Sequence, residues 1–188
     1  MPRATHRVPC GLHLFRAMLT CSVLWAAAIP MAVALETRPE HTVKAAFIYR
    51  FTAYVEWPVD CLGRERFTIA VLGDPSVAEA LRGLTVGRAL LNRTVQVRQV
   101  ASLSEARDAQ VMFIGRNPRT DLRRLLAPLG THCMLIISDE VGGLESGSAV
   151  NFLMADSRLR FEVSLPAARR ARLKVSSEML SVAARVQQ

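Results

Sequence analysis

The chain has 188 residues, of which 51% are hydrophobic and 21% charged, a composition that excludes a disordered chain and suffices for one domain with a buried core. Its formal net charge is +8, and the excess is mostly arginine. The densest basic cluster is Arg169-Arg170-x-Arg172-x-Lys174, and no aromatic residue lies near it to stack on a base. The sequence therefore indicates no nucleic-acid partner.

The N-terminal segment has the features of a secretory signal peptide. Three arginines precede an apolar run over residues 17–29, and Ala32-Val33-Ala34 offers the small residues that a signal peptidase accepts. We predict a signal peptide over residues 1–34, cleaved near Ala34, and one exported domain over residues 35–188. An uncleaved anchor is the alternative, but the apolar run is short for a membrane span and a proline interrupts it. The predicted mature chain keeps 21 basic and 16 acidic residues, a net charge of +5.

Helical and strand patterns alternate through the mature chain. Helical spacing covers residues 41–56 and stops before Pro58. Apolar runs and period-two alternation predict strands over 67–73, 94–100, 110–115, 133–140, 149–154 and 159–164, with helices over 76–83, 102–107 and 118–130 between them. Alanine-rich helical sequence, split near Leu173, closes the chain.

This order predicts a single α/β domain with a parallel-rich mixed sheet, flanked by helices on both faces. The last two strands, joined by residues 155–158, are expected to form a late antiparallel hairpin. Ligands of such sheets bind outside the carboxyl ends of the strands, where the sequence places Asp74, Arg116 and Asp139. A small-ligand-binding module would use that crevice.

The residue types of a catalytic triad are present, but their spacing argues against one. Ser138 has no G-x-S-x-G elbow, and His132 lies at the other end of the same predicted strand, roughly 20 Å away. The glycine-rich loop over 141–148 lacks the lysine of a phosphate loop, and no histidine or cysteine cluster has metal-ligand spacing. We therefore expect no enzymatic activity, no cofactor and no metal.

Two cysteines, Cys61 and Cys133, follow the predicted cleavage site. An oxidising compartment permits a disulfide between them. Cys133 also opens the apolar run CMLIIS, where a buried free thiol fits equally well. Both alternatives remain open at this point.

Four segments in a fixed order resemble the YfiR family of exported bacterial regulators: KAAFIYRFTAYVEWP, FTIAVLGD, AQVMFIG and LRFEVSLPAARRARLKVSSEMLSVAARV. The similarity spans about Val43 to Val186. It implies a periplasmic α/β domain with no transmembrane span after signal cleavage. It also implies a repressor that binds the periplasmic sensing domain of an inner-membrane diguanylate cyclase, YfiN, and so lowers cyclic-di-GMP and limits biofilm. A homodimer is a further expectation from the family.

Three positions depart from the family pattern. Arg50 stands where asparagine is usual, and Gly147-Ser148 stands where a glycine pair is frequent. Ala109 stands where some relatives have a cysteine that pairs with one after the Trp-Pro motif. Cys61 therefore lacks that partner, and Cys133 is the remaining cysteine.

Arg160 and Glu162 alternate with Phe161 and are expected on one strand face. With Arg158 and Arg50, we predict that they form a partner- or ligand-binding site, so that charge reversal at Glu162 weakens repression and leaves folding intact. A surface ion pair or a contact at the rim of the core is the alternative for these residues. The alternative function is a periplasmic small-ligand-binding module that serves another envelope sensor, such as a histidine kinase.

Overall fold

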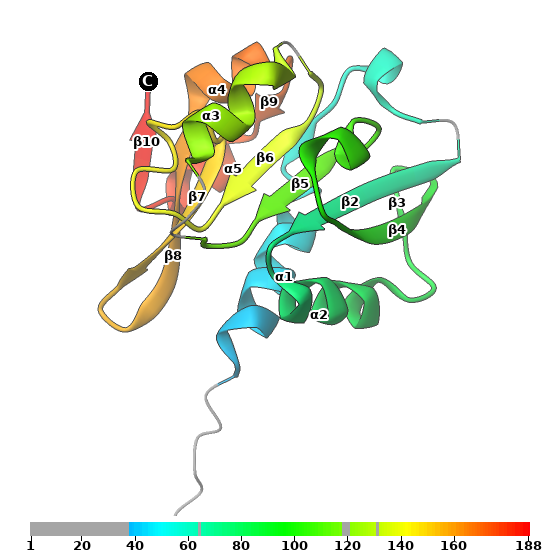
Figure 1. The fold of residues 1–188 in the computed structure, drawn as a ribbon, viewed down its shortest axis with the longest axis horizontal. Coiled ribbons are helices and arrows are strands. Elements are labelled where there is room, and N and C mark those ends of the chain that lie inside the picture. The colour runs from blue at the N-terminus through cyan, green and yellow to red at the C-terminus, as the bar shows by residue number, and fades with distance from the viewer. Residues whose placement is uncertain (1–37, 64, 118–120, 131) are drawn as a thin grey trace, which may run out of the picture. The chain divides into compact units, whose positions relative to one another are not determined.

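An eight-stranded mixed sheet organises the protein (Figure 1). The computed structural model describes residues 38–63, 65–117, 121–130 and 132–188, so the predicted signal peptide lies outside the described residues. The elements are α1 (Glu40–Phe51), β1 (Val55–Glu56), η1 (Val59–Cys61), β2 (Arg66–Leu72), α2 (Pro75–Thr85), β3 (Ala89–Leu90), β4 (Arg93–Val100), η2 (Leu103–Ala106), β5 (Val111–Ile114), α3 (Leu122–Leu126), η3 (Ala127–Leu129), β6 (Leu135–Ser138), β7 (Val150–Ala155), β8 (Arg158–Ser164), α4 (Leu165–Arg170), β9 (Lys174–Val175), α5 (Ser177–Val182) and β10 (Arg185–Gln187).

The strand order is β10-β8-β7-β6-β5-β2-β4-β3. Strands β4, β2, β5, β6 and β7 run parallel, whereas β7 and β8 form an antiparallel hairpin and β3 pairs antiparallel with β4. The hairpin extends from the sheet at the lower left of Figure 1. The predicted α/β class, the parallel-rich mixed sheet and the late hairpin are therefore confirmed.

Helices cover both faces of the sheet, as predicted. On the face that we call the first, α1 and α2 pack on buried side chains of β2, β5, β6, β7 and β8. Phe47 and Phe51 of α1 contact Phe152 and Phe161 there, with the Phe51 and Phe161 ring centroids 4.8 Å apart. On the second face, η2, α3 and η3 pack on Ala70, Met112, Ile114, Met134 and Ile136. In Figure 1, α1 and α2 lie below the sheet and α3 lies above it.

The first helix is shorter than predicted. It ends at Phe51, because the N–H groups of Ala53 and Tyr54 turn back to carbonyls three residues earlier. Val55–Glu56, predicted as helix, pairs with Lys174–Val175 in a separate two-stranded sheet. Proline at position 58 disfavours helix in the residue before it, which suits an extended segment here.

The alanine-rich C-terminal segment is split near Leu173, as predicted, but only part of it is helical. It divides into α4, β9, α5 and β10, with Ser164 and Ser176 accepting a backbone hydrogen bond at the start of each short helix. Arg172 adopts a left-handed conformation with φ of 61°, which ends the first helical segment. The final strand, β10, adds a parallel edge to β8.

None of the helices in the described ranges is both long and apolar enough to span a bilayer.

Candidate functional site

A line of four polar side chains crosses the second face of the sheet. Ser138, Asn151, Glu162 and Arg185 are cross-strand neighbours on β6, β7, β8 and β10. Ser138 Oγ donates a 2.7 Å hydrogen bond to Asn151 Oδ1, and Asn151 Nδ2 donates at 2.9 Å to Glu162 Oε1. Arg185 Nε donates at 2.7 Å to Glu162 Oε2. We call these four residues the polar row.

The polar row is buried at one end and open to solvent at the other. Ser138, Asn151 and Glu162 are 0%, 2% and 8% exposed, whereas the Arg185 side chain is 49% exposed. Arg185 also pairs with Glu145 at 2.9 Å. The hydrogen bonds that Arg185 donates to Glu162 and Glu145 raise the pKa of Arg185, and the Arg185 guanidinium lowers the pKa of Glu145. A buried polar network of this kind stabilises the fold only while every member keeps its partners.

The loop over residues 141–148 covers the buried end of the polar row. A Cβ atom on Gly143 would lie 2.3 Å from both Asn151 Oδ1 and Ser138 Oγ, so no other residue fits without displacing the row. Arg123 fastens the same loop by donating a 2.6 Å hydrogen bond to the Glu145 carbonyl. The loop is therefore held on the sheet from two sides.

Asp139, at the carboxyl end of β6, is the centre of a second polar cluster. It accepts a 2.7 Å hydrogen bond from Lys44 and lies 3.3 Å from Arg116. Lys44 is only 5% exposed and also pairs with Glu40. Burial works to lower the pKa of Lys44, but the hydrogen bonds and charges of Asp139 and Glu40 outweigh it, and that pKa is raised. This cluster ties α1 to the strand ends.

The predicted strand-end crevice exists as a cavity of about 280 Å³. It lies where the chain order reverses, with β4 on one side of β2 and β5 on the other. The lining residues are Leu72, Gly73, Ala101, Ser102, Leu103, Ile114, Gly115, Asn117, Leu122, Leu125 and Glu140.

The polar residues predicted for this crevice serve other contacts. Asp74 accepts the Val77 N–H at the start of α2, while Arg116 and Asp139 pair with each other beside the cavity and do not line it. Glu140 does line it and accepts the Asn117 N–H at 2.6 Å. The sequence located the crevice but not its polar group.

The structure brings three of the four predicted contact residues onto one face. Arg158 and Arg160 are exposed on β8, on the same side as Glu162. Arg50 lies in the last turn of α1, which packs on the Phe161 side, so it is on the opposite face.

Glu162 is not a free surface carboxylate, because it pairs with Arg185 at the rim of the core. Charge reversal there would set a cation against Arg185, so we now expect it to destabilise the fold as well. Sequence reasoning missed Arg185, whose only signal is the three-residue alternation of Arg185-Val186-Gln187.

A disulfide joins Cys61, at the end of η1, to Cys133, before β6, with their Cα atoms 5.6 Å apart. Arg172 lies beside this bond, pairs with Asp60 at 2.8 Å and lowers the pKa of Asp60. The structure therefore has the disulfide and not the buried free thiol.

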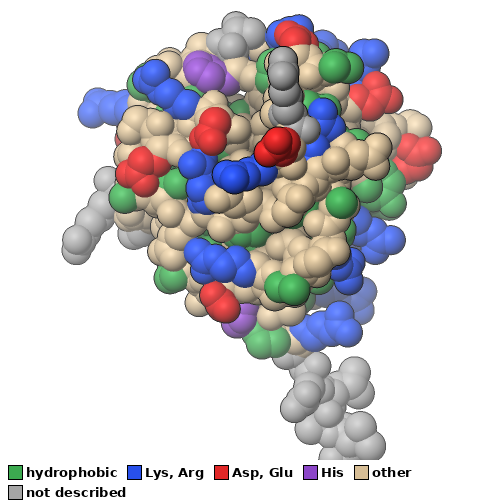
Figure 2. Space-filling view, turned by 90° about the vertical axis from the view of Figure 1, so that its right-hand side faces the viewer, with side chains coloured by type: hydrophobic (Ala, Val, Ile, Leu, Met, Phe, Trp, Pro, Cys, Tyr) green, Lys and Arg blue, Asp and Glu red, His purple; other side chains and the backbone are tan. Residues whose placement is uncertain are grey.

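The residues of the rejected triad do not assemble. Ser138 Oγ donates to Asn151, and His132 precedes the strand that Ser138 ends. Within the described ranges, no three His, Cys, Asp or Glu side chains gather closely enough to hold a metal ion. Figure 2 shows cationic and anionic side chains interspersed over one face of the molecule, without a stripe of a single sign.

The fold and these contacts define an α/β domain. Its polar side chains at the strand ends are largely engaged in ion pairs or in the polar row. The chain belongs to the YfiR/HmsC-like family, whose family model matches residues 41–184. This is a family of periplasmic regulators without a known catalytic role.

The comparison with curated proteins found no match. Among solved structures, the chain resembles a conserved domain protein from Vibrio cholerae O1 biovar El Tor, with a TM-score of 0.51 and 10% identity over 79% of this chain. It also resembles an ABC domain in complex with L-Trp from Streptococcus pneumoniae, with a TM-score of 0.46 and 10% identity over 78% of this chain. The chain spans 60% of the length of each. The first likeness supports the fold alone.

Proposed function

We propose that this protein is an exported, non-enzymatic repressor that binds the periplasmic sensing domain of an inner-membrane diguanylate cyclase. The observation that carries the proposal is the family match over residues 41–184, which covers the described helices and strands apart from Glu40, the first residue of α1, and the edge strand β10. In the cell, the repressor would keep cyclic-di-GMP low and oppose biofilm formation. A homodimer, also expected from the family, is testable by light scattering on the purified protein.

Repression by binding requires a difference in affinity. The protein must bind the inactive state of the cyclase more tightly than the active state, because a ligand with equal affinity for both states does not shift the equilibrium between them. A signal then acts by changing that difference. A rigid contact surface suits this role, since little conformational freedom is lost on binding.

The second face of the β7–β8 hairpin is our proposed contact surface. The side chains of Arg158 and Arg160 project from it and make no hydrogen bond or ion pair with any part of the chain that the structure describes. Beside them, Arg185 keeps half of its side chain exposed. Three arginines on one face favour an acidic partner surface, because guanidinium groups pair with carboxylates in two parallel hydrogen bonds. Glu162 would act as a positioning residue that holds Arg185.

The test is cellular cyclic-di-GMP in a deletion strain complemented with variants. Deletion should raise cyclic-di-GMP, and the wild-type gene should restore it. An Arg158→Glu/Arg160→Glu variant should fold, as judged by its melting temperature, and fail to restore it. Arg50→Glu, the same change on the opposite face, should restore it. An unchanged cyclic-di-GMP level on deletion would count against the repressor role, and full restoration by the double variant would count against this surface.

A second candidate function rests on the 280 Å³ cavity at the strand ends. It is a small-ligand-binding module that serves another envelope sensor, such as a histidine kinase. A ligand of this cavity would raise the melting temperature of the purified protein. Substituting Ser102 by Trp should abolish that rise, and a rise that survives the substitution would place the ligand elsewhere.

A further inference from the structure

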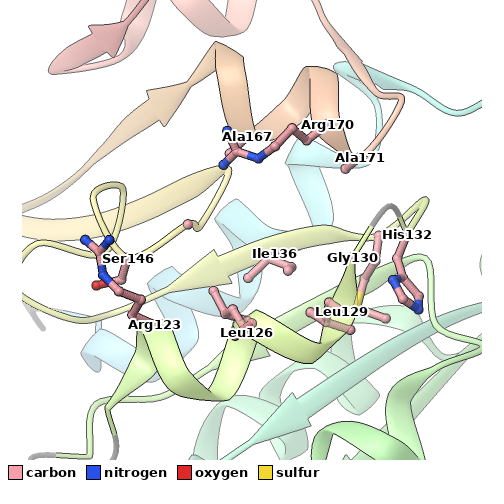
Figure 3. Close-up of a pocket in the computed structure, with 13 residues that line it drawn as sticks. Arg123, Leu126, Leu129, Gly130, His132, Ile136, Ser146, Ala167, Arg170 and Ala171 are labelled. Carbon is pink, nitrogen blue, oxygen red and sulfur yellow. The ribbon is translucent and has the colours of Figure 1, made fainter.

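We propose a separate binding site for a small organic anion with an apolar body, in the cavity between α3 and α4 (Figure 3). The cavity has a volume of about 300 Å³, at the small end of the range for ligand sites. Its lining residues are Arg123, Leu126, Ala127, Leu129, Gly130, His132, Met134, Ile136, Ser146, Gly147, Ala167, Arg170 and Ala171.

One side of the cavity is apolar. Its walls come from Leu126 of α3, Met134 just before β6, Ile136 of β6 and Ala167 of α4, and Figure 3 shows Leu126 and Ile136 between the two helices. Met134 and Leu126 are buried, so they belong to the hydrophobic core on the second face of the sheet. Such a surface favours the hydrocarbon part of a ligand over water.

The other side of the cavity is cationic. Arg123 and Arg170 extend from opposite walls toward the end that Ser146 marks (Figure 3). The side chain of Arg170 makes no hydrogen bond or ion pair with the residues that the structure describes. The side chain of Arg123 donates to the Glu145 carbonyl through only one of its nitrogens. No aspartate or glutamate is among the described lining residues. The uncompensated charge selects an anion, and guanidinium groups suit a carboxylate in particular.

The polar end is held in place before any ligand arrives. Gly147 has a φ of 115°, a conformation that other residues rarely adopt, and it brings Ser146 over α3. The Arg123 hydrogen bond to the Glu145 carbonyl and the Arg185 ion pair with the Glu145 side chain fix the same loop. At the opposite end, His132 Nδ1 is buried and has no hydrogen-bond partner among the described residues. A hydrogen-bonding group of a ligand at that end would satisfy it.

This site goes beyond the proposed function and does not depend on it. The cavity lies on the second face beside α4, and the loop over 141–148 links its wall to Arg185 and the polar row. A bound anion could therefore act on the proposed contact surface through that loop. Binding is measured on the purified protein alone, so a negative result leaves the repressor proposal untouched.

The experiment is a titration of the ¹⁵N-labelled protein with three probes, followed by NMR chemical shifts. Benzoate has both the anionic head and the apolar body, benzyl alcohol lacks the charge, and acetate lacks the body. We expect saturable benzoate binding on the order of 1 mM, with the largest shifts in α3, α4 and residues 146–147. Benzyl alcohol and acetate should each bind at least about fivefold more weakly.

Two variants make the assignment specific. Arg170→Gln should weaken benzoate binding about tenfold, while the matched control Arg169→Gln, an adjacent exposed arginine outside the cavity, should change it less than twofold. Ala127→Leu, an exposed helical position at the cavity wall, should block binding without altering the fold. Absence of benzoate binding, equal binding of benzyl alcohol, or equal effects of Arg170→Gln and Arg169→Gln would each overturn the proposal.

Discussion

Removing the Glu162 carboxylate tests the polar row most directly. In Glu162→Ala, the buried Asn151 Nδ2 loses its acceptor and Arg185 loses its shorter ion pair. The hydrogen bond from the Asn151 amide to the carboxylate is worth about 1.5 kcal/mol, and the Arg185 pair about 1 kcal/mol, because half of that arginine is solvated and screened. Truncating a buried side chain and leaving a buried donor unpaired bring the expected loss of unfolding free energy to about 3 kcal/mol.

Urea denaturation measures this loss, and two variants calibrate it. Glu162→Gln keeps the volume but opposes one of its two donors, so about 1.5 kcal/mol is expected. Arg160→Ala lies two residues away on the same face but is exposed, so it should stay within about 0.5 kcal/mol of wild type. The Glu162→Ala loss corresponds to a fall in Tm of about 6–12 °C. A Glu162→Ala protein as stable as Arg160→Ala would refute the reasoning that the row stabilises the fold.

Three further predictions concern other contacts of the same fold. Gly143→Ala should lower the unfolding free energy by at least about 2 kcal/mol, because its Cβ would overlap the buried row; urea denaturation giving a wild-type midpoint would show that the loop can move away. Lys44 has a folded pKa above its unfolded value, so its stabilisation is complete below pH 10.5 and lost as pH rises through the folded value. The stability advantage of wild type over Lys44→Met in urea should therefore shrink above pH 10.5, and a constant difference to pH 12 would contradict the ion pair with Asp139. Removing the disulfide by Cys61→Ser/Cys133→Ser should cost up to about 4 kcal/mol, given the 72-residue separation, and abolish any effect of reductant on the urea midpoint; a reductant effect that persists would have another origin.

The sequence was sufficient to predict the principal strands of the sheet because these strands are apolar runs bounded by turn residues. β2, β5 and β6 are buried along most of their length, so each appears as a continuous hydrophobic segment. Strands β1, β9 and β10 have two or three residues each; β1 and β9 pair with each other across most of the domain, and β10 pairs with β8 beyond α4, β9 and α5. A pattern of that length carries no periodicity, so only the tertiary pairing reveals it.

The same limit applies to the site. Strand alternation correctly placed Arg160 and Glu162 on one face, but burial of Glu162 depends on Asn151 and Arg185 from neighbouring strands. Likewise, the sequence places Asp139 at the end of a strand, but it does not reveal the hydrogen bond that Lys44, 95 residues earlier, donates to it. Residue type and spacing identify where polar groups lie, and long-range pairing decides which of them remain available for binding.

The aromatic contacts of α1 also determine when this domain can fold. Phe47 and Phe51 contact each other, and both also contact Phe152 and Phe161, about a hundred residues later in the chain. Loop closure over such a distance costs entropy before any contact compensates for it, so domains rich in distant contacts fold slowly. α1 can pack on α2 early, but its aromatic contacts with the hairpin wait until β7 and β8 have been synthesised. The packing of α1 on the sheet is therefore completed only after most of the chain has been synthesised.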